Sequence, residues 1–216
     1  MQKKFITNLA LLLLLNLLVK PFYILGIDAE VLKRVEETTP GRYGEYFALI
    51  GFTFILNIFL DLGVINYNTR NIAQNKQLLQ KHFAGIITLR GVLSIGYMVI
   101  ILLSGFILGY SSFQIKLLVI LGINQIFVAF ILYFRSNLSG LLLFKQDSIV
   151  SVMDRILLIG ICSILLWGRV TSQPFQIEWF IYAQTGAYLF TAILAGLLVL
   201  RQTGIIKPKF DITFSI

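Results

Sequence analysis

Residues 5–27 read FITNLALLLLLNLLVKPFYILGI, an apolar run broken by only a few polar side chains. A helix needs about 20 mostly apolar residues to cross the hydrocarbon core of a bilayer. Similar runs follow at 43–66, 83–110, 115–134, 149–167 and 179–200. Helices satisfy their own backbone N–H and C=O groups within lipid. The pattern therefore predicts an all-α polytopic membrane protein, a bundle of six transmembrane helices.

Composition excludes the main soluble classes. Hydrophobic residues make up 57% of the 216-residue chain, charged residues 13%, and the mean hydropathy is +0.85. These values fit neither a disordered chain nor an ordinary soluble domain. The net charge of +8 lies mostly in short loops. No basic face with interleaved aromatic residues is present, so no nucleic-acid partner is expected.

The distribution of Lys and Arg predicts the orientation. If the N-terminus is cytoplasmic, the inner segments carry ten basic residues and the outer loops five. This bias favours N-in and C-in topology. The first run ends in Lys20-Pro21 without a small-residue cleavage site, so we expect it to be retained as a helix. We expect one six-helix unit at 1–205 and a tail at 206–216 leading toward further segments.

Charged residues within the spans are the candidate functional groups. Each costs about 2.5–3.5 kcal/mol at the centre of a span and usually faces a protein interior or a wet cavity. Asp61 and Arg90 fall at similar depth on consecutive antiparallel runs, which predicts an ion pair. Asp154 and Arg155 are adjacent and should point in different directions. Lys20 precedes Pro21, which should kink its helix.

Structural alternatives exist for each of these groups. The Asp61–Arg90 pair could lock the fold without touching a ligand, and Lys20 could extend to the outer interface. Amides at membrane depth serve as interhelical hydrogen bonds as often as ligand contacts. Those with candidate binding roles are Asn16, Asn57, Asn124 and Gln125.

Enzyme chemistry is not indicated. The chain has no GxSxG, HExxH, phosphate-binding loop or paired-carboxylate motif. It has one histidine, His82, and one cysteine, Cys162, which makes a metal site improbable. No cofactor is predicted.

Two stretches carry a family resemblance. Residues Tyr43–Gln74 read YGEYFALIGFTFILNIFLDLGVINYNTRNIAQ, and Tyr133–Leu158 read YFRSNLSGLLLFKQDSIVSVMDRILL. Together with Lys20-Pro21 they resemble the polysaccharide and O-antigen flippases of the multidrug, oligosaccharidyl-lipid and polysaccharide exporter superfamily. The matching elements are Asp61-Leu62-Gly63 and Arg70-Asn71-Ile72-Ala73.

The resemblance implies translocation of a polyprenyl-diphosphate-linked oligosaccharide across a bacterial inner membrane by alternating access. Lys20, Arg90 and Arg155 would then face the lipid diphosphate. Asp61 would pair with Arg90 or exchange a coupling Na⁺ or H⁺, and Asp154 is a further candidate for that role. The family has two lobes of about six helices, so this chain corresponds to an N-terminal lobe that requires a second lobe or self-association.

Two rival functions remain open. A cation-coupled multidrug exporter of the same superfamily should favour acidic and aromatic groups in its cavity. A non-transporting membrane scaffold should turn its charged groups toward other helices. The flippase hypothesis instead expects Lys20, Asp61 and Arg90 to share a water-filled vestibule.

Overall fold

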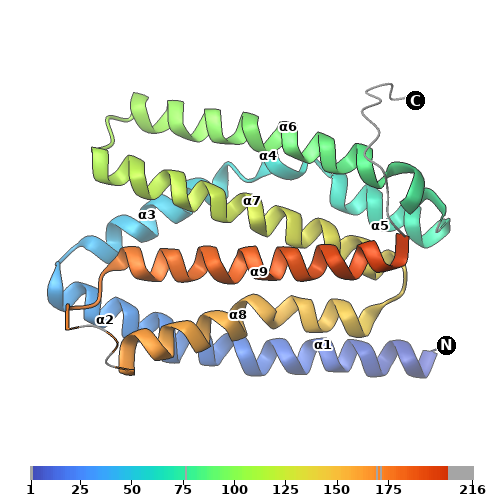
Figure 1. Ribbon diagram of the computed structural model, residues 1–216, viewed down its shortest axis with the longest axis horizontal. Coiled ribbons are helices and arrows are strands. Elements are labelled where there is room, and N and C mark those ends of the chain that lie inside the picture. Colours follow the sequence, from blue (N-terminus) through green and yellow to red (C-terminus); the bar gives the residue numbers. More distant parts are fainter. Residues whose placement is uncertain (1, 76, 169, 171, 204–216) are drawn as a thin grey trace.

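The computed structural model describes residues 2–75, 77–168, 170 and 172–203 (Figure 1). These residues are largely helical, and five helices are long and apolar enough to cross a membrane. The number is six if one bent pair counts as a single span. The helices lie side by side, and α1 starts at the same end of the bundle at which α9 finishes (Figure 1). Which side of the membrane this end occupies stays a prediction, and the tail at 206–216 lies outside the described residues.

The first helix is longer than expected. α1 (Gln2–Phe22) continues through a π-helical segment, η1 (Tyr23–Asp28), into α2 (Ala29–Thr38). The π-helical turn begins two residues after Pro21, whose missing N–H disturbs the regular pattern. The sequence predicts a span that ends at residue 27, followed by an outer loop over 28–42 in which 31–37 could form a short surface helix. In the structure the helix is continuous, and Val31 and Val35 lie one turn apart and are both buried. The burial of these two valines stabilises α2, although the opposite face of this helix is polar.

The second span is broken. It consists of α3 (Arg42–Ile55), α4 (Ile58–Asp61) and α5 (Val64–Gln74). The axis of α3 and the axis of the stretch from α4 to α5 meet at 42°. Leu62 and Gly63 both have positive φ. An α-helix requires negative φ, so α4 ends at this point. The sequence predicts a span that ends at residue 66, followed by a polar, helix-compatible stretch at 68–81 that lies along the cytoplasmic surface. In the structure α5 packs against α7 instead, with Asn68 buried between them.

The remaining spans are single helices. They are α6 (Gln77–Ile107), α7 (Ser112–Gly140), α8 (Phe144–Trp167) and α9 (Ile177–Thr203). A tight turn joins α6 to α7, and Ser111 and Gln114 form a capping box at the start of α7. α7 is longer than its predicted range, 115–134, because its polar end packs against α5.

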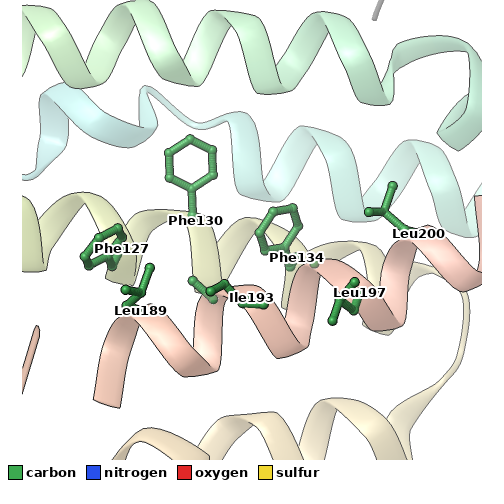
Figure 2. Close-up of a pocket in the computed structure, with 9 residues that line it drawn as sticks. Phe127, Phe130, Phe134, Leu189, Ile193, Leu197 and Leu200 are labelled. Carbon is green, nitrogen blue, oxygen red and sulfur yellow. The ribbon is translucent and has the colours of Figure 1, made fainter. Parts of the chain in front are cut away.

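α7 is the centre of the bundle. It packs against α3, α5, α6, α8 and α9, whereas α1 packs mainly on α8. Buried apolar residues form two clusters, and α7 contributes to both. Asn124 and Gln125 lie between Leu121 and Ala129, two α7 residues of the first cluster. An open apolar groove also runs along α7 and α9 (Figure 2).

The α5–α7 contact depends on a glycine, which gives a test of the packing. A β-carbon at Gly140 would lie 2.9 Å from Cβ of Ile72 and 3.2 Å from the carbonyl oxygen of Thr69. We expect Gly140→Val to lower the stability by about 1–3 kcal/mol through overpacking, measured as thermal unfolding in detergent. Gly160→Val on α8 is the control, because nothing lies within 4 Å of that position. Equal effects of the two changes would contradict the close contact.

Candidate functional site

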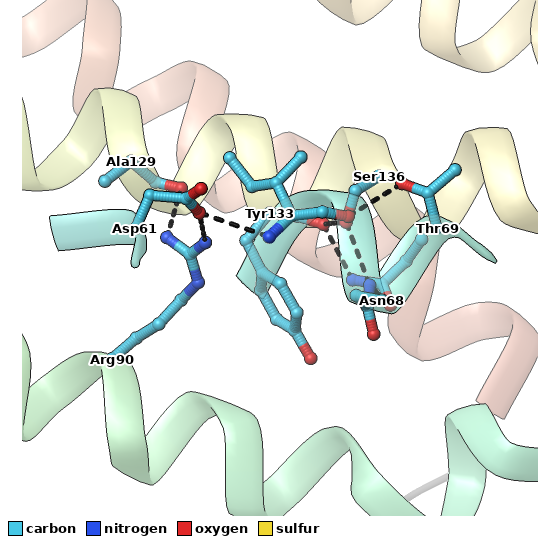
Figure 3. A network of polar contacts seen from close by, with 9 residues as sticks. Asp61, Asn68, Thr69, Arg90, Ala129, Tyr133 and Ser136 are labelled. Carbon is cyan, nitrogen blue, oxygen red and sulfur yellow. Dashed lines mark hydrogen bonds and ion pairs between the residues drawn. The ribbon is translucent and has the colours of Figure 1, made fainter. Parts of the chain in front are cut away.

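Asp61 and Arg90 form the ion pair that the sequence predicts (Figure 3). Arg90 Nη2 lies 2.7 Å from Asp61 Oδ1, and Nη1 donates to the carbonyl oxygen of Ala129 at 3.0 Å. The guanidinium also lies 5.1 Å from the centroid of the Tyr133 ring. Arg90 is 2% exposed and Asp61 33%. With both terminal nitrogens occupied, Arg90 is not accessible to a ligand in this conformation.

The pair holds the broken span in place. Besides Arg90, Asp61 Oδ1 accepts a hydrogen bond from the backbone N–H of Ile65 at 3.2 Å, in the first turn of α5. A second bond from α6 supports α3, where the Tyr97 hydroxyl donates to the carbonyl oxygen of Thr53 at 2.9 Å. Two side chains of α6 thus stabilise the backbone on both sides of α4. These contacts favour a structural role for the ion pair.

Arg155 lies in a different part of the bundle, among aromatic side chains. Its guanidinium is 4.6 Å from the centroid of the Tyr23 ring in η1, and Tyr188 of α9 lies close to it. We expected Asp154 and Arg155 to point apart, but Nε and Oδ2 approach to 3.6 Å. That separation is an ion contact but too long for a hydrogen bond. Arg155 therefore has no tightly bound carboxylate partner among the described residues.

Lys20 lies beside the contact surface between α1 and α8, which we call the seam. Asn16 donates to Ser151 Oγ at 3.1 Å, and Arg155 contacts Tyr23. Lys20 is four residues after Asn16 and three before Tyr23, so it lies on the edge of this contact face. Its side chain is exposed and forms no ion pair with any described residue. We call Asn16, Lys20, Tyr23, Ser151, Asp154, Arg155 and Tyr188 the α1–α8 cluster.

Further polar contacts extend this cluster toward the α2–α3 end of the bundle. Tyr43 lies close to the carboxylate of Asp28, and Gln184 Nε2 donates to the Tyr46 hydroxyl at 2.8 Å. Tyr43 and Tyr46 have ring centroids 5.5 Å apart. The α1–α8 cluster therefore adjoins a second acid and three more polar side chains.

The predicted amides at mid-membrane do not gather around Lys20 or Arg155. Asn57, at the break between α3 and α4, donates to Gln125 Oε1 on α7 at 3.3 Å. Asn124 is 2% exposed, and neither of its side-chain polar atoms has a hydrogen-bond partner within the described structure. The Asn57–Gln125 contact joins two helices, as an interhelical amide bond does.

The described structure does not bring Lys20 together with Asp61 and Arg90, as the expected shared vestibule requires. Lys20 belongs to α1 and Arg90 to α6, and these helices lie at opposite edges of the bundle (Figure 1). Lys20 lies on α1 between Asn16, whose side chain contacts Ser151 of α8, and Tyr23, whose ring contacts Arg155. Asp61 and Arg90 lie elsewhere, because α4 packs mainly against α6 and α1 mainly against α8.

Sequence analysis missed two groups of polar residues. Asn68 Nδ2 donates to Ser136 Oγ at 2.8 Å and to Asn137 Oδ1 at 2.9 Å, which fastens α5 to α7 (Figure 3). Arg135 Nε donates to Asp147 Oδ1 at 2.6 Å, joining α7 to α8. All of these residues fell outside the predicted spans. Tyr23 and Tyr188 were missed as well, although Tyr23 follows Lys20 by about one turn.

Metal ligation has no evident basis in the described part of the chain, where no three His, Cys, Asp or Glu side chains come together. Comparison with protein-family models, curated proteins and solved structures found no match for this chain. The resemblance to flippases therefore rests on the quoted motifs, and the functional argument rests on the geometry above.

The ion pair can be tested by comparing single and double substitutions. Asp61→Ala should destabilise the protein by about 3–5 kcal/mol, because it leaves the buried Arg90 without its counter-charge. Asp61→Ala combined with Arg90→Met should recover part of that loss, since no charge then remains buried. The measurement is the yield of folded protein and its thermal unfolding in detergent. A double variant no more stable than Asp61→Ala would show that the two charges do not depend on each other.

Proposed function

We propose that this chain is one lobe of a flippase that moves a polyprenyl-diphosphate-linked oligosaccharide across a bacterial inner membrane for surface polysaccharide synthesis. The observation that carries the proposal is the α1–α8 cluster. Within a bundle of apolar spans it contains two cations, Lys20 and Arg155, and no carboxylate of the described residues lies within hydrogen-bonding distance of either.

The chemistry of this pair fits a diphosphate. A guanidinium donates two parallel hydrogen bonds to a phosphate, and such charge-assisted bonds are about twice as strong as neutral ones. Lysine adds a compact charge that reaches a second phosphate. Arg155 has a side-chain exposure of 29%, and Lys20 is exposed, so both are accessible where Arg90 is not.

The mechanism follows from where these residues lie. Arg155 and Lys20 bind the diphosphate at the seam of α1 and α8, while the glycan crosses in the wet interior between this lobe and a second one. The second lobe is either a further part of the same protein or another copy of this chain. Rigid-body rocking of the lobes exposes the seam to each side in turn. The Asp61–Arg90 pair keeps the broken second span attached to α6 during that motion.

A second candidate is a cation-coupled drug exporter of the same superfamily. The observation favouring it is the presence of two carboxylates, Asp28 and Asp154, close to four tyrosines. Acids with aromatic faces suit a lipophilic cation and a coupling Na⁺ or H⁺. The two candidates differ in the charge of the substrate, so they respond oppositely to loss of Arg155.

The decisive experiment is complementation. The complete gene that encodes this chain should restore surface polysaccharide in a flippase-deleted host with a matched glycan. Arg155→Gln and Lys20→Gln should each reduce restoration about tenfold or more, because each removes a charge-assisted contact of about 1.5–3 kcal/mol. Lys116→Gln, an exposed cation near the start of α7, is the control and should leave restoration unchanged.

Three outcomes would redirect the proposal. Failure to restore polysaccharide in several matched hosts would overturn it. Retained activity in Arg155→Gln together with loss of drug resistance in Asp154→Asn would favour the exporter. Normal expression without either activity would favour a non-transporting scaffold.

Water access to the seam gives an independent test. In a Cys162→Ser background, a cysteine at Lys20 should react with a water-soluble maleimide in membranes. A cysteine at Leu18 should be protected, because Leu18 is exposed on nearly the opposite face of α1 and therefore contacts lipid. Labelling of both positions, or of neither, would argue against a hydrated seam.

A further inference from the structure

The apolar groove between α7 and α9 is a feature that the proposed transport does not use. Its volume is about 380 Å³, and every residue that lines it is apolar. Phe127, Phe130 and Phe134 of α7 form one wall, and residues from Leu189 to Leu200 of α9 form the other (Figure 2). The hollow exists because Ala192 and Gly196, one turn apart, leave little side chain between these walls.

The groove faces away from the polar interior. Ile193 lies nine residues after Gln184, and Leu197 nine after Tyr188, which at 3.6 residues per turn places each pair on opposite sides of α9. Gln184 and Tyr188 are buried against the polar contacts described above. Ile193 and Leu197 are 54% and 52% exposed. Within a membrane, such an exposed apolar surface contacts hydrocarbon.

The length of the groove matches one leaflet. Leu189 and Leu200 are eleven residues apart, which corresponds to about 16 Å along the helix. The hydrocarbon core is about 30 Å thick, so one leaflet contributes about half of that. The groove therefore has the length of a single acyl chain that enters from the end at which α9 finishes.

A cation lies at that end of the groove. Arg201 directly follows Leu200 and is exposed. Arg201 also follows Leu197 by four residues, which places it on the face of α9 that lines the groove. Basic sites between transmembrane helices on the cytoplasmic side bind anionic lipid headgroups. The charge at the mouth thus complements the phosphate of a lipid whose chain fills the groove.

We propose that the α7–α9 groove is a binding site for an anionic phospholipid. One acyl chain lies against Phe127, Phe130 and Phe134, and the headgroup phosphate contacts Arg201. The site is separate from the α1–α8 cluster and does not depend on the proposed transport.

Native mass spectrometry of the purified full-length chain tests this site, using phosphatidylglycerol and phosphatidylcholine of equal chain length. Leu197→Trp should fill the groove and reduce retained phosphatidylglycerol by roughly fivefold, a loss comparable to one lipid-facing interaction of about 1 kcal/mol. Ile164→Trp, at a 60% exposed position on α8, is the matched control. Arg201→Gln should reduce the preference for phosphatidylglycerol over phosphatidylcholine about fivefold, whereas Lys116→Gln should not.

Each variant should first show the same elution profile and thermal unfolding as the unmodified chain. Equal lipid retention by Leu197→Trp and Ile164→Trp would overturn the proposal. A dimer that Leu197→Trp dissociates, without a change in bound lipid, would also overturn it and assign the groove to a second copy. Because no transport is measured, failure here leaves the flippase proposal intact.

Discussion

A membrane span that breaks inside the bilayer must find partners for the backbone groups that the break releases, because hydrocarbon offers none. In this protein the span from Arg42 to Gln74 breaks on both sides of α4. α6 supplies the missing partners, with Tyr97 donating to Thr53 and Arg90 holding the carboxylate that caps α5. The positions of α3, α4 and α5 around the central helix α7 depend on these two side chains.

The charged residues of the interior differ in whether they hold neighbouring backbone. Arg90 is committed to the backbone of its neighbours, so its charge is neutralised where the fold needs it. Lys20 and Arg155 lie at the border of α1 and α8, where Arg155 contacts the Tyr23 ring and lies 3.6 Å from Asp154, and both remain partly or fully exposed. Under the proposed function these two cations bind the anion, while Arg90 stays part of the packing.

Part of this arrangement is present in the sequence alone. Alternation of long apolar runs with short charged loops predicts the helical membrane fold, and the similar depth of Asp61 and Arg90 predicts their ion pair. The spacing of Asn16, Lys20 and Tyr23 also places them together on one face of α1. No local signal shows that α8 covers that face, because Ser151 and Arg155 are more than 130 residues away in the chain.

What the sequence determined by itself was which segments are apolar enough to lie in a membrane, since burial in hydrocarbon depends on composition over about 20 residues. Only the tertiary structure decided where helices continue, break or meet. Val31 and Val35 extend the first helix because α2 has a surface to pack on, and α5 joins the bundle because Asn68 finds Ser136 and Asn137. Those outcomes depend on pairing between distant residues, which the order of residues along one segment does not specify.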